Sequence, residues 1–212
     1  MKSKEFNALI IDASTDNLYV MLLSQGKVLG GKSCDSIKKH SETVMTEIDR
    51  VLKLGGLKLS DVDVFVCGVG CGSFTGLRVA ISTVKGLNAP LGKKLVAVNT
   101  LETLAYNRAG TTDAVMDAGG GRFYHARYVD GKQTVAPRLS EGDIVGCVVS
   151  AAQAEELGAD GSCVFFDKER DLSDKLAGLG RDKILKGEFS DDLTPLYLRR
   201  CQAEELLDAG KL

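Results

Sequence analysis

Apolar and polar residues alternate in blocks over the first part of the chain, and the earliest blocks have the length of strands. Apolar runs at residues 8–12 and 18–23 predict two buried strands, and residues 27–33 predict a third, more exposed one. The turn signal Ser24-Gln25-Gly26 separates the second run from the third. Strands joined by connections this short pair with their neighbours, which predicts an antiparallel meander.

The next blocks carry helical periodicity and alternate with apolar runs. Apolar residues recur over residues 44–52 at the spacing of one helical stripe, and the pair Gly55-Gly56 ends the pattern. The run at residues 62–69 is apolar at successive positions, which indicates a central strand of a parallel sheet. The other elements predicted in this half are a helix over 76–91, a strand over 95–98 and a short helix over 101–108. The predicted order is therefore β-β-β-α-β-α-β-α.

The second half repeats this alternation with weaker signals. The polar, glycine-containing stretch at residues 107–112 separates the two halves and is the best candidate for a boundary between lobes. Beyond it, strands are expected over 113–116, 123–129, 144–149 and 163–166, and helices over 151–157, 171–179 and 196–209.

Composition limits the classes of protein that the chain can belong to. It has 212 residues, of which 44% are hydrophobic and 26% charged, and this mixture excludes a disordered or collagen-like chain. The net charge of −2 argues against a protein that grips nucleic acid by itself. The six cysteines form no C-x-x-C pair, which favours reduced, buried residues over a zinc site or disulfides. No signal-peptide core or membrane-length apolar run is present, so we expect a soluble, cytoplasmic protein.

A glycine-rich loop between the strand at 62–69 and the following helix is the sharpest local feature. Glycines permit close approach of the backbone, and amide groups at a helix N-terminus bind anions, so the loop can cradle a phosphate or a carboxylate. It can equally be only a tight strand-to-helix crossover, because it matches neither a P-loop nor a clean dinucleotide-binding fingerprint. The candidate anion-binding or nucleotide-like residues are Asp12, Ser14, Gly70, Gly72, Ser73, Thr75, Gly76 and Arg78.

Two polar residues near the predicted turns invite a catalytic interpretation. Asp12 ends the first strand, where it can hold a hydrated cation or, as aspartate often does, cap a turn. His40 begins the first helical pattern and is a conceivable general base, but no second catalytic group is placed beside it. We therefore expect both residues to be structural, and we expect no catalytic residue.

The loop and several other segments resemble one known family. The stretch Gly-Cys-Gly-Ser-Phe-Thr-Gly-Leu-Arg at residues 70–78 closely resembles the Gly-Pro-Gly-Ser-Phe-Thr-Gly-Leu-Arg signature of the TsaB (YeaZ) family. Further similarities are Ile-Asp-Ala-Ser at 11–14, His-Ser-Glu at 40–42 and Pro-Leu-Tyr-Leu-Arg at 195–199. The departures are Cys71 in place of proline and the glycine-rich stretch Asp-Ala-Gly-Gly-Gly at 117–121. The matches cover nearly the whole chain in order.

The resemblance implies a fold and a role. The fold is α/β, the two-lobe actin/Hsp70/sugar-kinase-like (ASKHA, ribonuclease H-like) architecture, with a mixed sheet flanked by helices in each lobe. We expect an N-terminal lobe at residues 1–106 and a C-terminal lobe at residues 107–212. The implied role is that of a non-catalytic scaffold or activator, which binds and stabilises TsaD together with the small ATPase TsaE. TsaD modifies adenosine 37 of tRNA, so this chain would meet tRNA only indirectly.

The sequence itself can be checked for the metal ligands on which the catalytic activity of TsaD depends. The resemblance places the stretch Asn-Thr-Leu-Glu-Thr-Leu at residues 99–104 on the metal helix of TsaD, which reads Asn-His-Met-Glu-Gly-His. Thr100 and Leu104 then stand at the two ligand positions, and neither offers an imidazole nitrogen. We therefore expect no metal and no cofactor. The alternatives are an ATPase or small-molecule kinase of the same fold and, with less support because H-E-x-x-H is absent, a glycoprotease.

The resemblance also suggests where a partner binds. The family docks on TsaD through the first two helices of its N-terminal lobe. The helix over 76–91 has apolar residues on more than one face, which indicates either a fully internal helix or a helix with an interface on its outer side. Without TsaD the same surface can form a homodimer. The candidates for the outer stripe are Val44, Met45, Ile48, Val79, Thr83 and Leu87.

Overall fold

The computed structural model describes residues 6–34, 37–141, 143–144, 147–148, 163–165 and 171–199. Its elements follow the chain in this order: β1 (Ala8–Asp12), β2 (Leu18–Ser24), β3 (Lys27–Cys34), α1 (Ile37–Gly55), a 3-10 turn (Leu59–Asp61), β4 (Val64–Gly70), α2 (Phe74–Asn88), β5 (Lys94–Asn99), α3 (Thr100–Ala105), β6 (Thr111–Gly119), β7 (Arg122–Val129), β8 (Lys132–Glu141), β9 (Asp143–Ile144), β10 (Cys147–Val148), β11 (Cys163–Phe165) and α5 (Ser173–Lys186).

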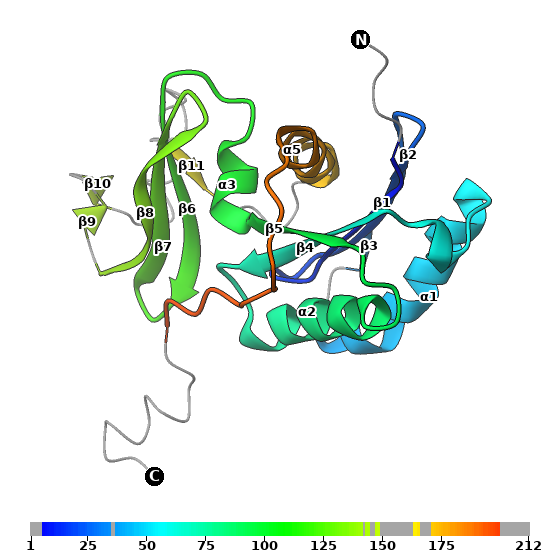
Figure 1. Ribbon diagram of the computed structural model, residues 1–212. Helices are drawn as coiled ribbons and strands as arrows, with labels where there is room; N and C mark the ends of the chain where they lie inside the picture. Colours follow the sequence, from blue (N-terminus) through cyan, green and yellow to red (C-terminus); the bar gives the residue numbers. More distant parts are fainter. Residues whose placement is uncertain are drawn as a thin grey trace.

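The first sheet has the order β3-β2-β1-β4-β5 (Figure 1). Strands β1, β2 and β3 pair antiparallel, as the short connections predict, and β4 and β5 join β1 in parallel. The meander forms because residues 24–26 turn the chain back, with Gly26 at a φ of +72°. Strand β4 is central and buried on both faces, which explains its continuous apolar sequence.

Helices cover both faces of this sheet (Figure 1). On one face, Leu9 and Ile11 of β1 pack in a core with residues of α1 and α2. On the other face, Ala8 and Ile10 share a second core with α3, α5 and the second sheet. Gly180 lets α5 approach, because a Cβ there would lie 3.1 Å from a methyl group of Val66. Within the described residues, no helix is long and apolar enough to span a membrane.

The second sheet repeats the pairing of the first. Its order is β11-β6-β7-β8, with β6, β7 and β8 in an antiparallel meander and β11 parallel to β6. In the same way, β1, β2 and β3 form a meander with β4 parallel to β1. The expected two-lobe architecture, with a mixed sheet flanked by helices in each lobe, is therefore confirmed. The division of the chain at residues 106 and 107 stays a prediction.

Several predicted elements differ from the observed ones. Helix α1 begins at Ile37, about two turns before the apolar pattern at residues 44–52, because the mostly polar residues between them continue a helix without adding to its apolar stripe. Strand β8 was not predicted, since it is a polar edge strand that tolerates Pro137. The helix expected over 151–157 lies outside the described residues.

The segment that follows α5, residues 187–199, is called the strap here. Its last described residues were expected to begin a helix at residue 196, but the strap has no helical turns as far as residue 199. Backbone contacts with the first sheet explain this, because the amide of Ser190 donates to the carbonyl of Leu95 and that of Leu196 to the carbonyl of Val69. The strap thus covers the open edge of β5 and runs past α2 toward the end of β6 (Figure 1). The rest of the expected helix, residues 200–209, lies outside the described residues.

Candidate functional site

The turn between β1 and β2 is the first part of the candidate site. Asp12 is almost fully buried at the end of β1, and its Oδ1 accepts a hydrogen bond from the amide of Ser14 at 2.7 Å. Burial raises the pKa of Asp12, and the hydrogen bonds from Ser14 only partly oppose this shift. The geometry is that of an aspartate capping its own turn, the simpler of the two interpretations of this residue.

The glycine-rich loop packs directly against that turn. A Cβ on Gly72 would lie 1.9 Å from the carbonyl oxygen of Ser14, and a Cβ on Gly76 would lie 1.8 Å from that of Ala13. The amide of Ser73 donates to the carbonyl of Ser14 at 2.6 Å. Glycine is therefore required at both positions because the two backbones touch.

Hydrogen bonds within the protein already use some of the donors of this loop. The amide of Ser73 is bonded to the turn, and the amide of Gly76 donates to the hydroxyl of Ser73 at 3.1 Å as an N-terminal cap of α2. An anion at this place would have to compete with both bonds. The arrangement favours the crossover interpretation, and the anion site stays a prediction. Thr75 is exposed on the first turn of α2, away from this packing.

Cys71 occupies the position at which the resembled family has proline. The peptide bond before it is cis, its side chain is fully buried, and its carbonyl accepts a hydrogen bond from the hydroxyl of Thr100 at 2.7 Å. Burial raises the pKa of the Cys71 thiol to about 12. The thiol therefore stays protonated at neutral pH and behaves as an apolar side chain, as the sequence predicts. Cys67 is also buried and free, and Cys163 is buried.

Arg78 lies apart from the other predicted loop residues. Its guanidinium carbon lies 3.9 Å from the centre of the Phe74 ring, and its Nε donates to the hydroxyl of Tyr197 at 3.2 Å. The side chain is exposed, whereas Asp12 and Ser14 are buried. The structure thus brings Asp12, Ser14 and the loop together and places Arg78 on the surface of α2.

The two histidines form hydrogen bonds that stabilise the structure around them. His40 is fully buried, and its Nε2 lies 3.0 Å from the carbonyl oxygen of Asp16. Burial lowers the pKa of His40, so the neutral ring that donates to this carbonyl is favoured. His125 and Arg127 both bond the carboxylate of Asp113 on the second sheet. Burial raises the pKa of Asp113, but the hydrogen bonds from these two residues outweigh it and leave the pKa below its ordinary value.

Helix α3 fills the position that the resemblance assigns to metal binding in TsaD. Thr100 is buried, and its hydroxyl both donates to the carbonyl of Cys71 and lies 2.9 Å from the hydroxyl of Ser14. Leu104 is buried in the core between the sheets. Over the part of the chain that the structure describes, no three His, Cys, Asp or Glu side chains gather closely enough to hold a metal ion.

The residues predicted for the outer stripe divide into two groups. Val44 and Ile48 are 2% and 3% exposed in the core beneath the first sheet, so their assignment to the outer stripe was wrong. The stripe of α1 on which they lie is the one that faces the sheet. By contrast, Met45 is 52% exposed. Val79, Thr83 and Leu87 on α2 are half-buried, and Val79 and Leu87 pack against this core.

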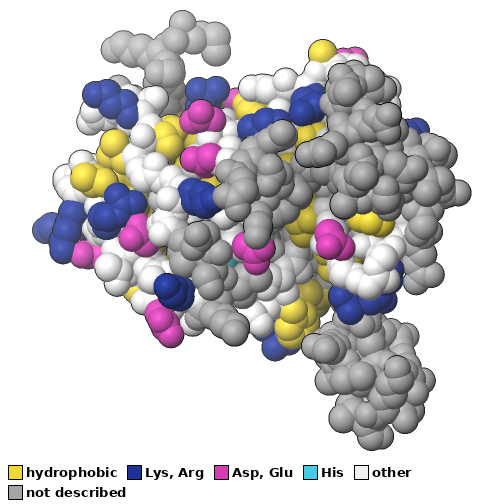
Figure 2. All heavy atoms as spheres, turned by 180° about the vertical axis from the view of Figure 1, so that it is seen from behind, with side chains coloured by type: hydrophobic (Ala, Val, Ile, Leu, Met, Phe, Trp, Pro, Cys, Tyr) yellow, Lys and Arg dark blue, Asp and Glu magenta, His cyan; other side chains and the backbone are white. Residues whose placement is uncertain are grey.

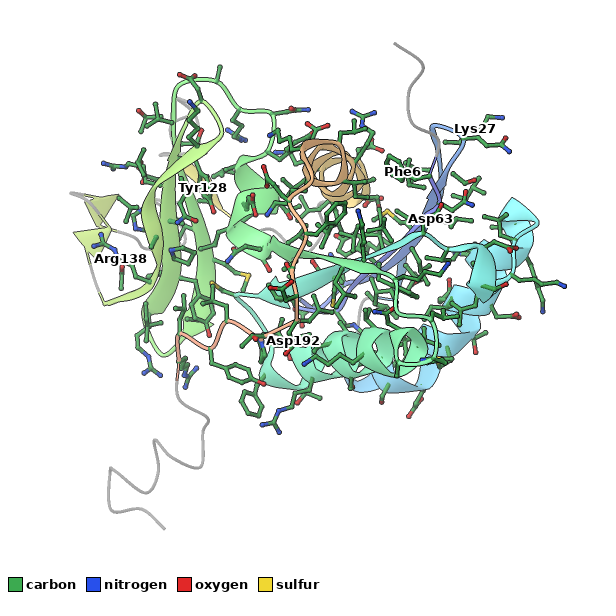
Figure 3. All side chains as sticks on the ribbon, viewed as in Figure 1. Phe6, Lys27, Asp63, Tyr128, Arg138 and Asp192 are labelled. Carbon is green, nitrogen blue, oxygen red and sulfur yellow. The ribbon has the colours of Figure 1, made fainter. Side chains whose placement is uncertain are left out.

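The strap contributes side chains that sequence reasoning missed. Asp192, labelled in Figure 3, forms an ion pair with Lys85 of α2 at 2.8 Å. The ring of Tyr197 packs on that of Phe74 with 4.6 Å between the ring centres. No local pattern predicts these contacts, because they join positions more than a hundred residues apart. The sequence signal in this segment was the motif Pro-Leu-Tyr-Leu-Arg at 195–199, which resembles the TsaB family but to which no role was assigned.

Comparisons with known proteins agree with this architecture. The family model for TsaD, the tRNA N6-adenosine threonylcarbamoyltransferase, matches residues 33–162, more than half of the chain. An uncharacterized protein of Mycobacterium tuberculosis is 30% identical over 184 residues, which cover 84% of each chain. The tRNA threonylcarbamoyladenosine biosynthesis protein TsaB of Escherichia coli is 31% identical over 126 residues, covering 57% of this chain and 54% of that protein.

A solved structure extends the likeness to the whole fold. YeaZ from Pseudomonas aeruginosa is 25% identical to this chain and superposes with a TM-score of 0.72, covering 91% of this chain and all of that one. Taken with the sequence matches, this structural match shows that the chain belongs to the TsaB (YeaZ) family.

Proposed function

We propose that this protein is a non-catalytic subunit of the machinery that makes threonylcarbamoyladenosine in tRNA. In this role it binds and stabilises a TsaD homologue, TsaE joins the pair, and the catalytic partner holds the tRNA. Membership of the TsaB family supports the pathway, since the relative in Escherichia coli is named as a biosynthesis protein of this modification. A cytoplasmic location follows from the proposal, because tRNA is modified there.

One observation carries the non-catalytic part of the proposal. The two positions of α3 that correspond by resemblance to metal ligands hold Thr100 and Leu104, and both side chains are buried in contacts with the protein. A hydroxyl bonded to Cys71 and an aliphatic chain in the core offer no imidazole ligand. Metal-assisted transfer therefore has no ligand pair in this helix, and the TsaD homologue must supply it.

We assign docking to the outer side of α2. Ser82 and Gly86 are exposed and lie four residues apart, so they share one side of the helix, and half-buried Val79 and Thr83 flank them. These four residues are called the α2 docking face. Met45, exposed on α1, and Leu87, at the contact of α2 with the core, lie at its margin. When TsaD is absent, two copies of this chain can pair through the same face.

The distribution of charge supports indirect contact with tRNA. Among the described residues on the face shown in Figure 2, basic and acidic side chains are interspersed with apolar ones, and neither sign forms a continuous stripe. Proteins that bind nucleic acid by themselves present a basic face, because they must neutralise several phosphates. With a net charge of −2, this chain depends on its partners for that neutralisation.

The proposal is tested by leaving the protein out. The TsaD homologue and TsaE of the same organism are incubated with unmodified tRNA, threonylcarbamoyl-adenylate and ATP, with and without this chain. We expect the formation of threonylcarbamoyladenosine, followed by mass spectrometry of digested tRNA, to fall to background when the chain is missing. Equal yields with and without it would exclude the proposed role.

A second test addresses the alternative of an ATPase or kinase. In actin-like kinases a glycine in the turn after the first strand lets the backbone approach phosphate, whereas here the turn reads Asp-Ala-Ser-Thr at residues 12–15. We expect the purified chain, incubated with Mg-ATP, to release no phosphate above a blank over several hours. Turnover that disappears in a Ser14→Ala variant and persists in a Ser82→Ala variant would favour the enzyme instead.

A further inference from the structure

Arg78 is held in one orientation by one contact within α2 and another from the strap. Its guanidinium lies over the ring of Phe74, at 3.9 Å from the ring centre, and its Nε donates to the hydroxyl of Tyr197. The two rings pack on each other at an interplanar angle of 30°. Phe74, Arg78 and Tyr197 are called the Arg78 cluster. The cation over an aromatic face and the hydrogen bond together restrict a side chain that is otherwise free to move.

The strap fixes Tyr197 in this cluster. Leu193 of the strap is fully buried beneath the first sheet, and Asp192 pairs with Lys85 of α2. On the other side of Tyr197, the guanidinium of Arg199 donates to the carbonyl of Ala118 at 2.6 Å. Tyr197 is thus anchored on both sides, although 41% of its surface is exposed. The phenol that orients Arg78 is therefore part of a firmly attached segment.

Arg78 has no carboxylate partner among the described residues. Other basic side chains of this part of the chain do pair, such as Lys85 with Asp192, Arg127 with Asp113 and Lys183 with Glu102. The contacts of the Arg78 side chain use its Nε and the face of its plane. Its two terminal nitrogens remain, and they form the planar fork that matches an oxygen pair of a carboxylate.

We propose that the Arg78 cluster is a preordered anchor for a carboxylate of the protein that docks on α2, an inference that rests on the proposed function. Because the arginine is already ordered, its binding to a carboxylate costs less conformational entropy than for a free side chain. The carboxylate is assigned to a protein because the cluster adjoins the α2 docking face, with Val79 next in sequence. Surfaces rich in tyrosine, phenylalanine and arginine are typical centres of protein interfaces.

The experiment measures the affinity of this chain for the TsaD homologue by isothermal titration calorimetry at low and high salt. We expect Arg78→Gln to weaken binding about tenfold and to reduce its salt dependence, because the variant loses a charge pair that docking removes from water. Arg78→Lys keeps the charge but loses the fork, so we expect only partial rescue. Tyr197→Phe keeps the ring stack and loses the hydroxyl, and it should weaken binding about threefold because Arg78 is less ordered.

Arg181→Gln is the matched control, since Arg181 is an exposed arginine on α5, at the opposite face of the first sheet. It should bind like the wild type, and all four variants should melt within about 2 °C of it, as exposed substitutions usually do. Normal complex formation with unchanged affinity for Arg78→Gln would overturn the inference and leave the proposed function standing. Failure of the wild type to bind the homologue would overturn both. A weaker affinity of Arg78→Gln for tRNA, with unchanged protein affinity, would assign the anchor to a phosphate and overturn the inference.

Discussion

Replacing Gly76 with alanine is expected to destabilise the protein by about 3 kcal/mol or more. The added Cβ would lie 1.8 Å from the carbonyl oxygen of Ala13. The backbone of the first turn of α2 fixes the position of the Cβ, and the oxygen belongs to the backbone of the turn after β1, so no rotamer change relieves the contact. The turn and the helix must separate, which also breaks the bond between Ser73 and Ser14.

Thermal or urea unfolding followed by circular dichroism measures this effect, and a loss of about 3 kcal/mol lowers the melting temperature by roughly 6–12 °C for a chain of this size. Gly86→Ala is the control in the same helix, because a Cβ there has no neighbour within 4 Å. Alanine has the higher helix propensity, so we expect this variant to gain about 0.5–1 kcal/mol. If Gly76→Ala melted at the wild-type temperature, the close contact between loop and turn would be disproved.

The elements with strong local signals could be predicted from the sequence. The apolar runs of β1, β2 and β4 reflect burial inside the first sheet, and the stripe of α1 reflects packing against it, so these signals give both the type and the order of the elements. Strand β8 shows no such signal, because an edge strand buries little and its residues are mostly polar. The strap shows none either, since tertiary bonds to Leu95 and Val69 determine its course.

The predicted interface shows how an apolar stripe can be assigned to the wrong side of a helix. Val44 and Ile48 belong to the apolar stripe by which α1 was predicted, and such a stripe faces the core first. An outer surface has to be sought among the remaining positions, and there Met45 is the exposed apolar residue of α1. Of the predicted loop residues, Gly72, Ser73 and Gly76 lie against the turn that follows Asp12, and the anion-binding role of the group stays a prediction. Arg78 was grouped with them by sequence alone, and Tyr197, 119 residues away, determines its actual orientation.

Replacing Gly86 with arginine is expected to abolish binding to the TsaD homologue, with a loss of at least about a hundredfold in affinity. Gly86 is exposed on the α2 docking face, and nothing lies within 4 Å of the position of its Cβ. The long charged side chain therefore fits the isolated chain and improves the helix, so the variant should melt at or above the wild-type temperature. In a complex that covers this face, the same side chain must be accommodated and desolvated without a prepared partner.

Gel filtration of the mixed proteins and titration calorimetry measure this loss. Gln133→Arg adds the same charge at an exposed position of β8, in the second sheet, and should leave the affinity unchanged. Comparing the two variants distinguishes a loss of docking on α2 from a general effect of added charge. The melting temperature distinguishes a loss of docking from unfolding of the variant. A complex that forms normally with Gly86→Arg would place the partner elsewhere on the molecule. In that case the exposed side of α2 would need another explanation, because helix α2 already packs on the first sheet through Ala80, Ile81 and Val84.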